Sequence, residues 1–174
     1  MKSALPAPLQ AFIGRAALPP VTMPDPIDRS AIRRWCEAIG DRNPIYLDPT
    51  HPATVALGGI VAPPAMLDAW TMARYDPHTQ SGGDDIPVLS ALTQLGFPVA
   101  VAIEIRQQYD RYLRPGDIIT QHRYVETIST EKKTSLGDGH FVVLRSDFID
   151  QRSAPVGHMH MTILKFGPRE IGRW

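Results

Sequence analysis

Residues 99–105 read Val-Ala-Val-Ala-Ile-Glu-Ile, an alternation of large apolar with small or charged side chains that opens the second half of the chain. A period of two is typical of a β-strand with one buried face, so the run predicts a strand that continues to Tyr112. Turn-forming residues 113–117 end it. Similar patterns predict three more long strands, Ile118–Ile128, Phe141–Ile149 and Val156–Phe166, with turns at Gly137–Gly139 and around 151–155. The four strands together predict one antiparallel meander.

The first half of the chain contains an amphipathic helix. Apolar side chains recur at i, i+3, i+4 and i+7, at Ile32, Trp35, Cys36 and Ile39. Asp28 is suited to be its N-cap and Gly40 its C-cap. The lone Cys36 excludes an internal disulfide, and its place on the apolar stripe predicts a buried side chain.

A second, longer helix is predicted to open at Pro64, because proline is tolerated in the first turn of a helix. We expect it to end at Asp76-Pro77 and to cover the apolar face of the sheet. Its expected buried side chains are Met66 or Leu67, Trp70 and Ala73. The whole pattern predicts an α+β fold in which an antiparallel sheet wraps one long helix.

The length and charge of the chain limit the class of protein. Its 174 residues suit one domain, 1–174, with an N-terminal arm at 1–20 and a mobile loop at 78–90. Eighteen basic and 18 acidic side chains cancel, so no overall field would gather nucleic acid or an anionic membrane. Apolar runs are far shorter than the ~20 residues of a spanning helix, and proline interrupts the N-terminus before a signal-like core. We expect a cytoplasmic protein without nucleic-acid or membrane partners.

The stretch that ends the first helix, residues 40–46, reads Gly-Asp-Arg-Asn-Pro-Ile-Tyr. It resembles the hydratase motif of MaoC-like hot-dog dehydratases, Gly-Asp-x-Asn-Pro-(aliphatic)-His. Three further blocks resemble the same family in the same order, at residues 59–67, 109–117 and 133–141. The chain is similar to the N-terminal, or FAS1-like, domains of that family, and among them to the hot-dog half of the α subunit of actinobacterial steroid side-chain enoyl-CoA dehydratases. The resemblance implies one hot-dog domain.

Tyr46 is the one residue of this stretch that departs from the family motif. In that family the Asp and the His hold and deprotonate the water that adds across an enoyl-thioester double bond. A phenol with a reference pKa of about 10 cannot accept a proton near pH 7 as an imidazole of about 6.5 can. The resemblance makes Asp41 and Asn43 relics of the catalytic site. The residues alone leave open whether these two serve chemistry or only cap the helix end and hold the loop.

The resemblance also implies how an acyl-CoA thioester would be held. Ala65 matches the family position whose backbone N–H polarises the thioester oxygen. Tyr46, Met66 and Trp70 are candidate substrate-binding residues, although a helix inside such a fold is core by default. No cofactor is expected, since CoA is part of the substrate.

Histidine and basic residues outside the motif give weaker signals. His158 and His160 share one face of a strand but lack nearby acidic partners, so no metal is expected. His51, the histidine nearest the motif, lies in a proline-flanked loop that we expect to face solvent. Basic residues near predicted strand ends either meet the phosphates of CoA or are simply solvated; they are Arg111, Arg114, Lys132 and Lys133.

These observations predict an accessory, substrate-tunnel subunit of a two-chain 2-enoyl-CoA hydratase or dehydratase. A partner MaoC-like chain with an intact motif would supply the catalytic Asp and His, and this chain alone would be weakly active or inactive. Two alternatives stay open. One is a free-standing homodimeric hydratase or acyl-CoA thioesterase, and the other is a non-enzymatic module that binds acyl thioesters. All three involve at least a dimer, because the acyl groove of this fold forms between two protomers.

Overall fold

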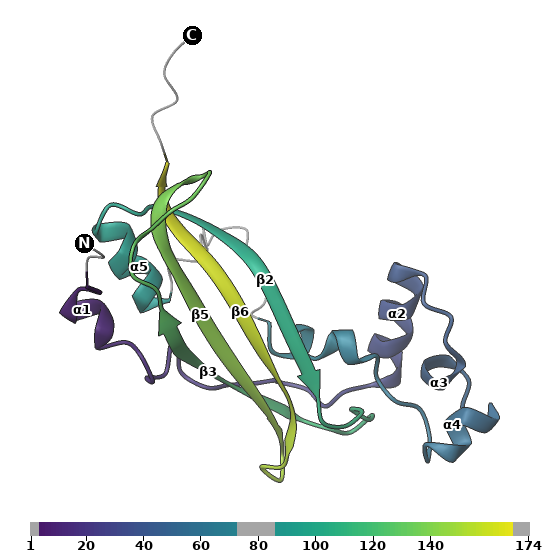
Figure 1. Ribbon diagram of the computed structural model, residues 1–174. Helices are drawn as coiled ribbons and strands as arrows, with labels where there is room; N and C mark the ends of the chain where they lie inside the picture. Colours follow the sequence, from purple (N-terminus) through teal and green to yellow (C-terminus); the bar gives the residue numbers. More distant parts are fainter. Residues whose placement is uncertain (1–3, 73–85, 169–174) are drawn as a thin grey trace.

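The computed structural model describes residues 4–72 and 86–168 (Figure 1). Helices and 3₁₀ turns are the main regular elements of the first part, and strands make up most of the second. The first part contains α1 (Ala7–Gln10), β1 (Val21–Thr22), α2 (Arg29–Ile39), α3 (Pro44–Leu47), α4 (Pro52–Ala56) and the 3₁₀ turns η1 (Pro64–Met66) and η2 (Ala69–Thr71). The second part contains α5 (Pro87–Gln94), β2 (Val99–Tyr109), β3 (Ile119–Ile128), β4 (Lys132–Lys133), β5 (Gly137–Asp150) and β6 (Pro155–Pro168). The predicted α+β class is confirmed.

The strands form one antiparallel sheet in the order β1-β3-β5-β6-β2, and β4 pairs with β5. Each predicted strand exists, but the predicted meander is wrong, because β2 lies beside β6 rather than beside β3. The edge of β3 is occupied instead by β1 and by an isolated bridge between Ala16 and Tyr124. The strand order therefore depends on pairings between residues far apart in sequence.

The turn predicted at Gly137–Gly139 is also wrong, since these residues begin β5. The turn lies just before them, where the Thr134 hydroxyl donates to the Gly137 carbonyl at 2.6 Å. A Cβ at Gly139 would collide with the Lys165 carbonyl oxygen and lie 2.8 Å from the Cα of Phe166. Glycine at residue 139 is explained by this close approach of β6, not by a turn.

Helix α2 forms as predicted. The Asp28 carboxylate accepts hydrogen bonds from the backbone N–H groups of Ser30 and Ala31 at 2.7 and 2.9 Å, and Gly40 is left-handed with φ of 73°. Ile32 and Cys36 are buried, whereas Ile39, predicted on the same apolar stripe, is 58% exposed. Residues 40–46 follow the end of this helix and lie at the surface of the core.

The long helix predicted from Pro64 is wrong in its described part. Only the short turns η1 and η2 form, and Met72 is already extended, with φ of −63° and ψ of 136°. The Thr71 hydroxyl donates to the Asp68 carbonyl, a local bond that competes with continuation of the helix. Ala73 and the predicted helix end at Asp76-Pro77 lie outside the described residues.

Helix α5 packs on the sheet where the long helix was expected. Its buried side chains are Val88, Leu89 and Leu92. The predicted loop at 78–90 is therefore wrong for residues 87–90, which are helical; residues 78–85 lie outside the described part. Helix α5 begins at Pro87, directly after Ile86, and its first residues are mostly apolar. Their periodicity did not distinguish so short a helix from the loop before it.

Two apolar cores share the inner face of the sheet. One packs α2 and the chain around Met66 and Leu67 against Ile119, Phe148 and Met159. The other packs α1 and α5 against a second set of strand residues, Val125, Ile128, Val142, Leu144 and Ile163. Figure 1 shows α1 and α5 close to the sheet and α2, α3 and α4 grouped well away from them. Among residues 4–72 and 86–168, no helix is long and apolar enough to cross a membrane.

Candidate functional site

The polar side chains of residues 40–46 are engaged in local hydrogen bonds. The Asp41 carboxylate accepts from the backbone N–H of Asn43 at 2.9 Å. The Asn43 side-chain oxygen accepts from the N–H of Ile45 at 3.3 Å and is the N-cap of α3. Both residues therefore hold the loop between α2 and α3, which was one of the two functions that the sequence left open.

Tyr46 lies on α3 and packs, half-buried, against the core that contains Ile32 and Cys36. Burial raises the pKa of its phenol above the ordinary value of 10, and electrostatic repulsion from Tyr112, Asp41 and Cys36 raises it further. At neutral pH Tyr46 is protonated, so it can donate a hydrogen bond but cannot act as a general base.

No described histidine replaces the missing base. Neither a hydrogen bond nor an ion pair joins Asp41 to any histidine in the part of the chain that the structure describes. His51 caps α4, accepting from the N–H of Ala53 at 3.3 Å, and His160 contacts Glu126 at 3.2 Å. Within residues 4–72 and 86–168, no three His, Cys, Asp or Glu side chains are close enough to hold a metal ion.

The predicted substrate-binding residues after Pro64 separate into different environments. Ala65 is exposed, and within the described residues no acceptor faces its backbone N–H. It belongs to a turn of three residues, so the helix-dipole contribution expected for a long helix is absent there. Met66 is 4% exposed and part of the core. Trp70 is half-buried and lines a surface hollow of about 290 Å³ with Met23 and Met72.

Arg111 forms an ion-pair cluster that sequence reasoning missed. Its guanidinium contacts the Asp117 carboxylate at 2.7 Å and the Asp150 carboxylate at 3.0 Å. Hydrogen bonds from the backbone of Ala154 and Arg152, followed by those from the Arg111 and Arg152 side chains, hold the pKa of Asp150 at about 2. Arg111 is thus a structural clamp rather than one of the free phosphate-binding residues considered above. Only proximity in the folded chain reveals this, because Asp150 is 39 residues away.

The β2 strand exposes an apolar row at the edge of the sheet. Five of its large side chains are between 36% and 54% exposed: Val99, Val101, Ile103, Ile105 and Tyr109. No strand of the described chain pairs with the outer edge of β2. An exposed, mostly apolar edge strand of 11 residues is a ready site for strand pairing with another chain.

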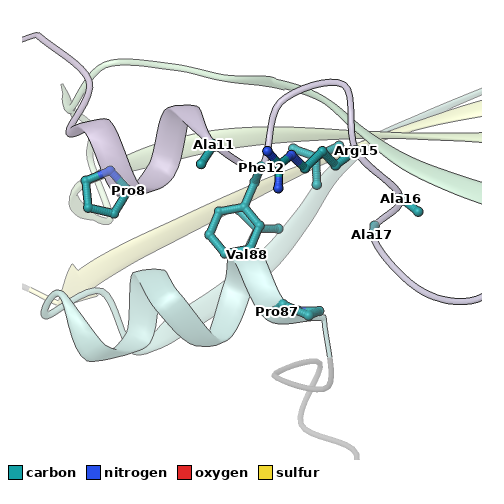
Figure 2. A pocket seen from close by; sticks show the side chains of 9 residues that line it. Pro8, Ala11, Phe12, Arg15, Ala16, Ala17, Pro87 and Val88 are labelled. Atoms are coloured by element: carbon teal, nitrogen blue, oxygen red, sulfur yellow. The ribbon is translucent and has the colours of Figure 1, made fainter.

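A separate apolar hollow of about 350 Å³ lies between α1 and α5, shown in Figure 2. Its lining includes Pro8, Phe12, Pro87 and Val88, with Arg15 as its charged residue. None of the motif residues lines it, so it is distinct from the region around Asp41 and Tyr46.

Comparison with known proteins defines the class. The model of the family described as "FAS1-like, dehydratase domain region" matches residues 11–159. The chain belongs to this family. Similar solved structures also include MaoC-like dehydratases at below 25% identity, which shows the shared fold alone. The predicted family and the hot-dog fold are therefore confirmed.

Two curated relatives and one crystal structure are similar to this chain at 35–37% sequence identity. The chain is 37% identical over 166 residues to a probable enoyl-CoA hydratase alpha subunit of Thermomonospora curvata, covering 93% of this chain and 52% of the relative. It is 35% identical over 145 residues to the 3-oxo-4,17-pregnadiene-20-carboxyl-CoA hydratase alpha subunit of Mycobacterium tuberculosis, covering 83% and 46%. The crystal structure of the ChsH1-ChsH2 complex from Mycobacterium tuberculosis matches with 35% identity and a TM-score of 0.77, covering 88% of this chain and 85% of that one. The chain spans about half the length of the two curated relatives.

Proposed function

We propose that this chain acts in the cytoplasm as an accessory subunit of a two-chain 2-enoyl-CoA hydratase or dehydratase. In this proposal it shapes the acyl-CoA tunnel, and a second MaoC-like chain supplies the catalytic Asp and His. The observation that carries the proposal is Tyr46, a half-buried phenol with a raised pKa where the family has its base.

The chemistry of the reaction explains why this one position matters. Addition of water to an enoyl thioester needs a base for the water and donors for the oxygen that gains enolate charge. The candidate base is a protonated phenol, and one oxygen of Asp41 is already bonded to the Asn43 N–H. The Ala65 N–H stays available as a donor among the described residues. The chain thus retains a backbone donor for the thioester oxygen, the Ala65 N–H, but lacks a base to activate water.

The exposed edge of β2 supports the need for a partner. Burying a side chain such as Ile105, now 54% exposed, is favourable by about 25 cal/mol per Å² of apolar surface. A partner strand would also satisfy the unpaired backbone groups of this edge. The similar chains named above as alpha subunits, and the similar chain solved in a two-protein complex, give independent support.

The test is to assay this chain alone and co-purified with a MaoC-like chain, encoded beside it, that has an intact Asp-x-Asn-Pro-x-His motif. We expect the complex to hydrate a 2-enoyl-CoA at an ordinary enzyme rate, roughly 1–10³ s⁻¹, and the single chain to be far slower. Replacing the partner's motif histidine by alanine should lower kcat by about 10²- to 10⁴-fold. Tyr46→Phe in this chain serves as the matched variant and should change kcat less than about threefold.

The homodimeric alternative predicts the opposite result. Turnover by the purified single chain within the ordinary range, lost on Asp41→Asn, would show that it is an enzyme by itself. Thioester binding without turnover, alone and with the partner, would instead identify a binding module.

A further inference from the structure

A surface hollow of about 310 Å³ lies beside the motif region. It is lined by Arg29, Arg114, Pro49, Gly58, Gly59, Ile60 and Pro115. Both charged residues of this lining are arginines, and none of the lining residues is acidic. The hollow is therefore positively charged and has rigid walls of proline.

Backbone hydrogen bonds bring the two arginines to the same hollow. The N–H of Gly116 donates to the Ile27 carbonyl at 2.8 Å, and the N–H of Ile27 donates to the Asp117 carbonyl at 2.9 Å. This pair joins the start of α2, which carries Arg29, to the loop that carries Arg114. The arrangement depends on main-chain contacts and not on the side chains that line the hollow.

The positive charge of the hollow is not neutralised within the described chain. No ion pair joins Arg29 or Arg114 to a carboxylate among the described residues. The carboxylates near the two guanidinium groups bind other donors: Asp28 caps α2, and Asp48 accepts from the Thr50 N–H. Asp117 pairs with Arg111 and accepts from the backbone N–H of Arg114 at 2.9 Å, not from its guanidinium. Arg114 donates to the Leu57 carbonyl, which orients its guanidinium and leaves other N–H groups for a ligand.

The position of Arg29 is not explained by local stability. Arg29 is the first residue of α2, where a cation opposes the helix dipole. Gly58, which lines the hollow beside Arg114, has φ of 79°, so its left-handed backbone alone explains the glycine. This unfavourable place of Arg29 favours an anion in the hollow over a purely structural function for that residue.

We propose that this hollow binds the phosphate groups of CoA, through Arg29 and Arg114. The inference rests on the proposed function, because it assumes an acyl-CoA ligand. Guanidinium groups bind phosphate oxygens with paired, charge-assisted hydrogen bonds. The loop that lines the hollow at Gly58–Ile60 continues to Ala65, so the pantetheine arm of CoA would follow this loop from the hollow to the thioester site.

The experiment is a titration of the full chain, labelled with ¹⁵N, with CoA, 3′-dephospho-CoA and phosphate-free pantetheine. We expect CoA to shift the amide signals of Gly58, Gly59 and Gly116. Arg29→Gln and Arg114→Gln should each weaken CoA binding about tenfold, the effect typical of one charged hydrogen bond, and should leave pantetheine binding unchanged. Arg33→Gln is the matched control, because Arg33 lies on the same helix and pairs with Glu37 outside the hollow. Thermal melting checks that each variant is folded.

The outcomes separate this inference from the proposed function. If Arg29→Gln and Arg114→Gln do not weaken the binding of 3′-dephospho-CoA, the hollow binds the 3′-phosphate. If they still weaken it, the hollow binds the diphosphate. Both results support the inference. CoA binding that is unchanged in Arg29→Gln and Arg114→Gln, or equally weakened in Arg33→Gln, overturns the phosphate site and leaves the proposed function standing. A chain that binds neither CoA nor pantetheine overturns the phosphate site, and the proposed function is then decided by the assay of the two-chain complex.

Discussion

Strands β6 and β2 are neighbours in one sheet and carry similar alternating apolar side chains, yet their surroundings differ. In β6, Met159 and Leu164 are 1% and 3% exposed, whereas in β2 Ile103 and Ile105 are about half exposed. β6 has a strand on each side and contributes Met159 and Ile163 to the two apolar cores. Among the described residues, β2 is paired on one side only and contributes no residue to either core. Alternation therefore predicts a strand but not whether its own chain covers it. An apolar strand that its chain leaves uncovered marks a surface for another molecule.

The strongest test of this contrast is a substitution in the buried part of the sheet. Phe148 lies on β5 and is fully buried in the core that also contains Ile32 and Cys36 of α2. Phe148→Ala should lower the free energy of unfolding by about 3–5 kcal/mol, through lost burial and the cavity left behind. Urea unfolding of the single chain measures this. A loss below 1 kcal/mol would show that the buried strands contribute no more than the edge.

A smaller loss is expected where β5 and β6 approach most closely. Gly139→Ala introduces a methyl group against the Phe166 backbone, and the strands must separate to accept it. Overpacking of this kind costs about 1–3 kcal/mol. The midpoint of thermal unfolding should fall, and an unchanged midpoint would contradict the close approach described here.

The clamp between the end of β2 and β5 should make stability depend on pH. The pKa of Asp150 is about 2 in the folded chain against 3.8 as a free side chain, so its contribution is complete above pH 4 and is lost as pH falls toward 2. Urea unfolding between pH 5 and 2 should show this decline. In Asp150→Asn the same range should give a flatter dependence, and an equal slope would exclude Asp150 as its source.

The smallest effect on stability is expected at the free edge. Ile103→Lys with Ile105→Lys should change the free energy of unfolding by less than about 0.5 kcal/mol, as exposed sites usually do. The same pair should disrupt association with a partner or with a second copy, because charged side chains block edge pairing. Size-exclusion chromatography with light scattering measures the association. Intact assembly in the lysine variant would place the interface elsewhere.

Local chemistry determined which elements could be predicted. Helix α2 has both caps in its own sequence, at Asp28 and Gly40, and it forms where predicted. The position of β2 beside β6 depends on pairs such as Tyr109 with Gly157 and Val99 with Phe166, which lie 48 and 67 residues apart and which no local pattern records. Glycine at 139 was read as a turn because the opposing Lys165 carbonyl is not visible in a sequence.

In the candidate site, too, local features could be predicted from the sequence and contacts between distant residues could not. The departure at Tyr46 is visible in a single residue, and local caps by Asp41 and Asn43 were one of the two predicted functions. The clamp at Arg111 and the pairing of Arg29 with Arg114 in one hollow were not predicted, because they join segments distant in sequence. The 3₁₀ turns after Pro64 were missed because a proline followed by an apolar run opens a short turn as readily as a long helix.

Among residues 4–72 and 86–168, the two apolar cores share one side chain, Met161, which packs against both. Because the two cores have only this side chain in common, each can unfold as its own cooperative unit, and the chain can unfold in two steps rather than one. Amide protons over α5 and those over α2 should then exchange with solvent at separate rates. The motif end of the molecule would be free to reorganise around a ligand or partner while the α5 end keeps its native packing.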